Sequence, residues 1–196
     1  VDAFRQEFRD LAKELPVNVN ELNRIGEAAG ALGIKKENIV EFTRVIAALG
    51  VSTNLAGEEG AAMLARFANI TNLPQDQFEN LASTIVALGN SGASTEREIA
   101  EMGLRIAAAG TQVGLTQAQI LGVANALSSM GLEAEGGGTA ISRVMIDMAQ
   151  SVATGSSKVA ELSALVGINV DQWDEFSEAV RTATAGELKA LAAQLG

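Results

Sequence analysis

Residues 110–148 read GTQVGLTQAQILGVANALSSMGLEAEGGGTAISRVMIDM, and they decide the fold more clearly than any other part of the chain. Two apolar patterns at helical spacing are joined there by a Gly-rich link. Between Ile106 and Ser142 the only charged residues are Glu133 and Glu135. No residue pattern in this stretch is typical of catalysis. The stretch therefore predicts a pair of helices whose uncharged surface belongs to the core or meets a partner.

The apolar pattern of this stretch recurs along the chain. An apolar residue is followed by others at positions +5, +8 and +12, and a glycine follows at +16 in four of five copies. The copies begin at Val17, Ile34, Leu73, Leu115 and Ile168, and their last positions are Gly33, Gly50, Gly89, Gly131 and Thr184. The +5 spacing is typical of a hydrophobic staple at a helix start, and a glycine commonly follows the last turn. Each copy therefore predicts one helix that ends at its glycine.

The residue after the first apolar position is the predicted N-cap of each copy. Three copies carry a capping residue there and Glu or Gln three residues later, which predicts a capping box. These pairs are Asn18 with Glu21, Thr116 with Gln119, and Asn169 with Gln172. Lys35 and Pro74 occupy the position in the other two copies, so we expect weaker helix starts there.

Further helices are expected between these copies. Their ranges are residues 2–15, 54–69, 95–109, 138–152, 157–166 and 186–195. Pro16 ends the first of them, and Thr95 with Glu98 predicts another capping box. No period-2 alternation indicates a strand.

These patterns predict an all-α protein, folded as a compact bundle of about nine to ten short helices. The period of about forty residues leaves helical-hairpin repeats as the alternative. We favour an irregular bundle, because the second helices of the successive units do not match one another well.

Composition excludes several classes of function. The 196 residues include no Cys and no His, so thiol nucleophiles and the commonest general base are missing. A net charge of -10 argues against a direct grip on nucleic acid, because Lys and Arg supply affinity for phosphates. No apolar run approaches the roughly 20 residues of a membrane span. The chain begins at Val1, and we expect it to be a fragment of a longer protein.

Few residues are candidates for a chemical site, and each has a more plausible structural role. The paired acids are Glu58/Glu59, Asp174/Glu175 and Glu133/Glu135, which we expect on the solvated surface. Gly136-Gly137-Gly138-Thr139 lacks the lysine of a P-loop, so it predicts a flexible or closely packed helix link. Core filling is expected of the methionines, Met63, Met102, Met130, Met145 and Met148. Trp173 is expected to pack on Ile168 in the staple of its helix. We therefore predict no catalytic, cofactor-binding or metal-binding residues.

The most distinctive runs of the chain are GLTQAQILGVANALSSMG and EGGGTAISRVM, both within residues 114–145. Together with the segments at 32–55, 65–73, 83–110 and 167–176, they closely resemble the core region of phage tail tape-measure proteins. The similarity extends over residues 19–195. Ala56 departs from it, because a small polar cap is expected before Glu58 and Glu59, and this predicts a weak helix start.

The resemblance implies a long, mostly helical virion protein, encoded by a phage or prophage. Such a protein lies in the lumen of the tail tube, sets tail length during assembly in the bacterial cytoplasm, and takes part in genome ejection. The implied partners are the tail-tube protein, tail assembly chaperones, baseplate or tail-tip proteins, and other copies of itself. In this frame residues 1–16 are a helix leading in from a longer chain, and residues 17–196 form the tape-measure core domain.

Two alternatives to this function stay open. The first is a helical protein-interaction or self-association module without a ruler role, which would use the weakly charged surface between Ile106 and Ser142. The second and less favoured is a cell-wall lytic enzyme domain. The resemblance brings no catalytic motif to this region, so we predict that the chain is not an enzyme.

Overall fold

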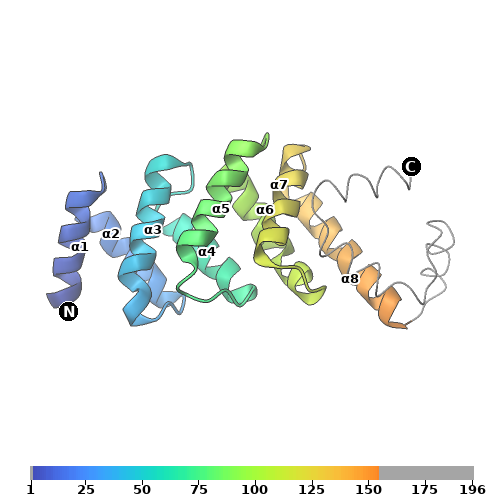
Figure 1. Cartoon of the computed structure of the whole chain (residues 1–196), viewed down its shortest axis with the longest axis horizontal. Coiled ribbons are helices and arrows are strands. Elements are labelled where there is room, and N and C mark those ends of the chain that lie inside the picture. Colours follow the sequence, from blue (N-terminus) through green and yellow to red (C-terminus); the bar gives the residue numbers. More distant parts are fainter. Residues whose placement is uncertain (1, 155–196) are drawn as a thin grey trace. The chain divides into compact units, whose positions relative to one another are not determined.

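A computed structural model describes residues 2–154, and every regular element in that range is a helix. The α-helices are α1 (Asp2–Glu14), α2 (Val19–Ala31), α3 (Ile39–Ser52), α4 (Gly57–Ile70), α5 (Phe78–Ser91), α6 (Glu96–Gln112), α7 (Gln117–Ser129) and α8 (Thr139–Thr154) (Figure 1). A 3-10 turn, η1 (Lys36–Asn38), precedes α3, and a π-helical turn, η2 (Ala134–Gly138), precedes α8. The all-α prediction is confirmed for this range. The helices predicted at 157–166, at 186–195 and from Ile168 lie outside the described residues.

Contacts between residues divide the chain into two units, Val1–Arg143 and Val144–Gly196. The first unit holds α1 to α7, η2 and the beginning of α8. Within it, α1 packs against α2 and α3. The division expected after residue 16 stays a prediction.

The helices of Val1–Arg143 lie in two layers. In one layer α2, α4 and α6 contact one another in turn, and in the other layer α1, α3, α5 and α7 do so (Figure 1). The helices α3, α5 and α7 begin 39 residues apart, at Ile39, Phe78 and Gln117. The predicted bundle is therefore confirmed, and its order is the regular one of a helical repeat. Helix starts keep this period although the apolar pattern shifts by three residues between Leu73 and Leu115. The packing is uneven, since α6 and α7 contact each other extensively and α4 and α5 do not.

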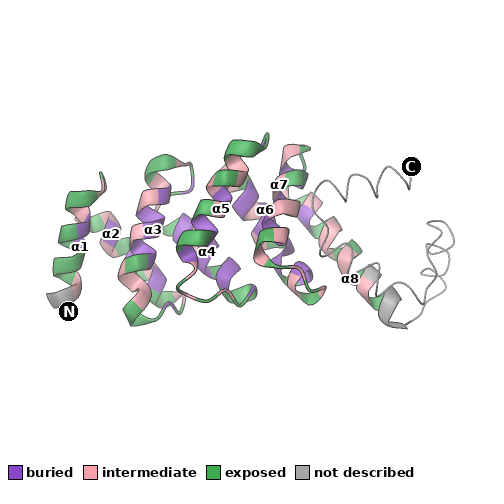
Figure 2. Ribbon diagram, viewed as in Figure 1, coloured by how far each residue is buried: buried purple, intermediate pink, exposed green. Residues whose placement is uncertain are grey.

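The core of this unit lies between the two layers, where Figure 2 shows the buried faces of the helices. On α2, α4 and α6 the buried residues recur four, seven and eleven positions after the N-cap, which is the spacing of one helix face. They are Leu22, Ile25 and Ala29; Gly60, Met63 and Phe67; and Ile99, Met102 and Ile106. In the other layer, the rings of Phe42 and Phe78 meet edge to face with centroids 4.6 Å apart.

Capping boxes open two of the helices. The hydroxyls of Thr95 and Thr116 accept from the backbone N–H three residues later, and the side chain of that later residue accepts from the N–H of the cap. Asn18 forms the first half of a box, because its Oδ1 accepts from the N–H of Glu21 at 2.9 Å. These bonds satisfy N–H groups that a helix start leaves free. The predicted box at Asn169 and Gln172 lies outside the described residues.

The predicted weak helix starts at Lys35, Pro74 and Ala56 are confirmed. No side chain caps η1 after Lys35, and α3 follows it without a capping bond. The helix α5 begins only at Phe78, four residues after Pro74, again without a side-chain cap. The helix α4 begins after Ala56, which has no side-chain acceptor for a capping bond. These starts therefore depend on other contacts.

Four helices end at a residue in the left-handed conformation. These residues are Gly33 after α2, Asn72 after α4, Gly114 after α6 and Gly131 after α7, with φ of 85°, 53°, 82° and 80°. In each case the next N–H bonds back to the last turn, as from Leu132 to the carbonyl of Leu127 at 3.2 Å. The ends predicted at Gly33 and Gly131 are confirmed.

Gly50 and Gly89 do not end their helices, contrary to the prediction. The helices α3 and α5 continue for two further residues beyond them. A Cβ at Gly50 would lie 3.0 Å from the Cβ of Ala56, and a Cβ at Gly89 would lie 2.7 Å from Oε1 of Glu96. Both glycines therefore allow the start of the following helix to cross closely, which is a packing role rather than a terminating one.

Candidate interaction surface

The paired acids within residues 2–154 lie on the surface. Glu58 and Glu59 are exposed in the first turn of α4, and Glu133 and Glu135 are exposed around the start of η2. No group of three or more His, Cys, Asp or Glu in this range could hold a metal ion. The third pair, Asp174/Glu175, and Trp173 lie outside the described residues.

The Gly-rich link is a closely packed turn. Within η2 the N–H of Gly137 donates to the carbonyl of Glu133 at 2.8 Å, and the N–H of Thr139 donates to the carbonyl of Gly136. A Cβ on the buried Gly138 would lie 2.5 Å from Cγ of Arg105. Of the two predicted kinds of link, the packed one is observed. Because the N–H groups of Gly137 and Thr139 already donate to backbone carbonyls, they are not free to bind an anion.

The methionines divide between the core and the surface. Met63 and Met102 are buried, as predicted, and Met145 is half-buried. Met130 is 69% exposed, so the prediction that it fills the core is wrong. It stands at the C-cap of α7, one residue before the left-handed Gly131. The side chain of Met148 is outside what the structure describes.

Met130 and Leu132 together form an exposed apolar pair at the end of α7. Leu132 is 42% exposed. The residues at the same positions after α2 are Leu32, which is half-buried, and Ile34, which is buried. The same helix ending thus places apolar side chains in the core after α2 and in solvent after α7.

Two open hollows lie between α6 and the segment around η2, and Leu132 lines one of them. Their volumes are about 580 and 560 Å³. The acids that line them are Glu98, Glu101, Glu133 and Glu135, and the one cation that lines either is Arg105. Glu133 and Glu135 form no ion pair with any residue between 2 and 154. The hollows are therefore acidic and adjoin apolar side chains.

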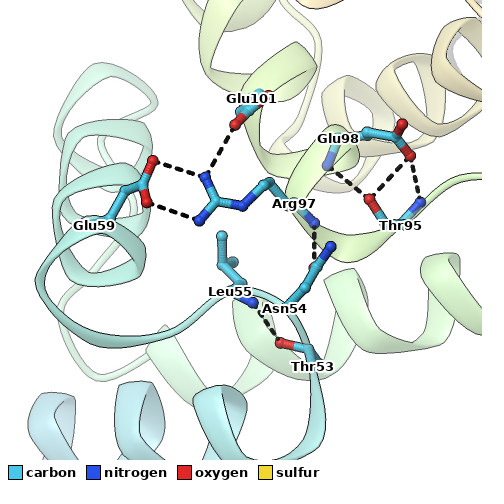
Figure 3. A network of polar contacts seen from close by, with 8 residues as sticks. All are labelled: Thr53, Asn54, Leu55, Glu59, Thr95, Arg97, Glu98 and Glu101. Atoms are coloured by element: carbon cyan, nitrogen blue, oxygen red, sulfur yellow. Dashed lines mark hydrogen bonds and ion pairs between the residues drawn. The ribbon is translucent and has the colours of Figure 1, made fainter.

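Arg97 joins α6 to α4 through a network of polar contacts (Figure 3). Its two terminal nitrogens donate to the two carboxylate oxygens of Glu59, each at 2.7 Å, and Nη1 also donates to Glu101 at 3.3 Å. Its backbone N–H donates to Oδ1 of Asn54 at 3.2 Å. The hydrogen bonds from Arg97 lower the pKa of Glu59. Arg97 thus binds the start of α4, where no capping residue stands.

Amide side chains join the connections at the other ends of the helices. Asn69 Nδ2 donates to the carbonyl of Leu32 at 3.0 Å, Gln75 Nε2 to that of Gly33 at 3.1 Å, and Gln117 Nε2 to that of Thr71 at 3.0 Å. Each bond links one two-helix period to the next. They satisfy the carbonyls of the two residues that follow α2 and of the C-cap of α4.

Hydrogen bonds lower the pKa of four surface acids within residues 2–154. The resolved shifts of Asp10, Glu41, Glu59 and Glu98 are all downward, each caused first by a hydrogen bond that favours the charged form. A general acid needs the opposite shift. The geometry of this part of the chain is therefore that of helix packing with one acidic and apolar surface.

A family model described as phage-related minor tail protein matches residues 5–195. The chain belongs to this family. The match covers nearly the whole sequence and confirms the resemblance to phage tail proteins, which places this minor tail protein in the virion tail. No curated protein and no solved structure matches the chain.

Sequence reasoning missed several contacts that hold this minor tail protein together. Arg97 and Glu59 stand 38 residues apart, and Gln75 and Gly33 stand 42 apart, so no local pattern pairs them. The exposed position of Met130 was also missed, because apolar spacing does not tell a covered face from an open one. No helix of the described part is long and apolar enough to cross a membrane.

Proposed function

We propose that this chain is a module of a tape-measure protein, which sets tail length in the tube lumen and takes part in genome ejection. The observation that carries the proposal is the family match combined with a regular helical period. A protein that measures length needs segments that add equal increments along the tail. Helices that begin every 39 residues at Ile39, Phe78 and Gln117 supply such increments.

The proposal includes the partners of such a protein. A ruler in a tube would contact the tail-tube protein along its length, assembly chaperones before the tube forms, and baseplate or tail-tip proteins at its end. Further copies of the chain would lie beside it. A net charge of -10 supports a role beside DNA without binding it, because like charges do not attract phosphates.

An in-frame deletion of residues 56–94 in the parent phage tests the ruler role. It removes one period, and it joins Leu55 directly to Thr95, the N-cap of α6, in place of Ala56, the N-cap of α4. If this segment lies in the tube as continuous helix, each tail shortens by about 58 Å at 1.5 Å per residue. If it keeps the layered fold, the tails shorten by a smaller but uniform amount. Electron microscopy of the tails gives the length.

The matched control is Phe67→Ala in the full-length chain, since Phe67 is buried in α4. This change weakens the same segment without shortening it, so any tails that form should have the normal length. Tails of unchanged length in the deletion phage would contradict the ruler role. Normal tails that fail to infect would assign the module to the tip or to ejection instead.

A second candidate function is protein interaction without a ruler role. The exposed pair Met130 and Leu132 beside the acidic hollows favours it. Light scattering of the purified chain over a range of concentrations tests self-association, since the average mass would rise with concentration.

A further inference from the structure

The surface around the end of α7 combines three features. Met130 and Leu132 are exposed, Leu132 lines one of two open hollows beside α6, and both hollows are lined by acids. We propose that this surface binds a basic amphipathic helix of a partner protein. The inference goes beyond the tail-length role and does not depend on it.

Leu132 is more exposed than the residues at equivalent positions in the fold. The residue after a left-handed helix end is Ile34, Leu73, Leu115 or Leu132. Ile34 is buried, and Leu73 and Leu115 are half-buried against the core, whereas Leu132 is 42% exposed. Adjacent exposed apolar side chains at such a position are typical of a binding surface.

The hollows have a shape that the backbone fixes in advance. Gly131 turns the chain at φ 80°, and the N–H of Leu132 is bonded to the carbonyl of Leu127 at 3.2 Å. A Cβ on Gly137 would lie 2.9 Å from the Cβ of Leu132, so η2 packs closely beneath that residue. A preformed surface loses little conformational entropy on binding.

The negative charge of the hollows indicates the chemistry of the partner that would bind there. Glu98, Glu101, Glu133 and Glu135 line the hollows against one cation, Arg105. Glu101 is bonded to Arg97, and Glu98 accepts from Thr95, but Glu133 and Glu135 have no ion pair in the described part of the chain. A partner with Lys or Arg on one face and apolar side chains on the other would satisfy both parts of the surface. Nucleic acid has the wrong charge for this site.

Oxidation of Met130 tests whether the surface is open in the complete chain. Met102 is the internal control, since it is fully buried in α6. Under dilute hydrogen peroxide we expect Met130 of the 196-residue protein to oxidise at least about tenfold faster than Met102, as measured by mass spectrometry. Equal protection of the two would mean that the chain itself covers the surface, and it would overturn the proposal.

Binding is tested with a labelled synthetic helix of about 18 residues that carries Lys on one face and Leu on the other. A second probe with Glu in place of Lys is its matched control. Fluorescence anisotropy at low salt should show binding of the Lys probe alone, and bound probe should slow the oxidation of Met130. Binding that leaves Met130 unprotected would overturn the proposal.

Two double variants assign the site. Met130→Ser with Leu132→Ser, and Glu133→Gln with Glu135→Gln, should each weaken binding of the Lys probe about tenfold. Glu7→Gln with Glu27→Gln makes the same charge change on exposed positions of α1 and α2, and it should change the affinity less than about twofold. Equal weakening by the control, or no effect of the serine variant, would show that net charge alone attracts the probe and would overturn the proposal.

Discussion

The helices α6 and α7 pack against each other, whereas α4 and α5 make few contacts with each other and pack mainly against their neighbours. Both α6 and α7 begin with a complete capping box. Neither α4 nor α5 has a side-chain cap. Instead, Arg97 of α6 binds Glu59 in the first turn of α4, and Gln75 ahead of α5 binds the connection between α2 and α3.

The difference shows two ways in which one helical period is stabilised. The α6–α7 pair depends on signals within its own sequence and on a direct interface, in which a Cβ at Gly110 would lie 2.7 Å from Cγ1 of Ile120. The α4–α5 segment depends on side-chain contacts with the periods before and after it. A repeat array can contain such a segment because each neighbour also contacts it.

The largest expected effect is on the α6–α7 interface. Ile120→Ala removes a fully buried side chain of α7, and it should lower the free energy of unfolding by about 2–5 kcal/mol. Chemical denaturation of the purified chain measures the loss. The control Val51→Ala, on a residue 52% exposed, should change stability by no more than about 0.5 kcal/mol. A similar loss for both would contradict the assignment of Ile120 to the core.

A smaller loss is expected from overfilling the same interface. Gly110→Val places side-chain atoms against Ile120 and should cost about 1–3 kcal/mol. Gly122→Ala is the matched control on α7, where a Cβ has nothing within 4 Å. That change should stabilise the protein by up to about 1 kcal/mol, because alanine favours a helix. Thermal unfolding measures the stability of both variants. A Gly110→Val variant as stable as the parent would contradict the close approach of α6 and α7.

Most helices of the described part could be predicted from local signals, since caps and apolar spacing act within one or two turns. The functions of glycines could not. Gly50 and Gly131 follow the same apolar pattern, yet one lies inside a helix and the other ends one. Only the neighbour that approaches, Ala56 in the case of Gly50, separates the two roles. The acidic hollow was beyond prediction for the same reason, because α6 supplies Glu98 and Glu101 from a distant part of the sequence.

Substitutions at the helix caps of the two regions should change the stability of the protein in opposite directions. Thr116→Ala removes the box of α7 and should lower stability by about 1 kcal/mol. Ala56→Ser supplies the cap that α4 lacks and should raise stability by about 0.5–1 kcal/mol. Denaturant midpoints measure both. If Ala56→Ser had no effect, neighbouring side chains would already satisfy the start of α4.

The smallest expected effect is a difference in acid sensitivity between the capping boxes at Thr95 and Thr116. The backbone N–H and the hydroxyl of Thr95 lower the pKa of Glu98 by hydrogen bonding. A lowered folded-state pKa adds stability above the unfolded pKa of about 4.3, and that stability is lost as pH falls through the folded value. The box at Thr116 uses Gln119, which does not titrate. The variant Glu98→Gln should therefore lose less stability than the parent between about pH 5 and 3.

Thermal unfolding across that pH range compares the parent with Glu98→Gln. Gln119→Glu is the reciprocal variant, and it should add acid sensitivity to the start of α7. Identical pH profiles for the parent and Glu98→Gln would contradict a charged box at Thr95.

Amide hydrogen exchange in the intact chain tests the central comparison most directly. The N–H groups of Glu98 and Gln119 are bonded to the cap hydroxyls at 3.3 Å each, whereas the equivalent groups of Glu59 and Asn80 have no cap to bond. We predict slower exchange at Glu98 and Gln119, and higher opening free energies through α6 and α7 than through α4 and α5. Exchange through α4 and α5 that is equally slow or slower would contradict the account.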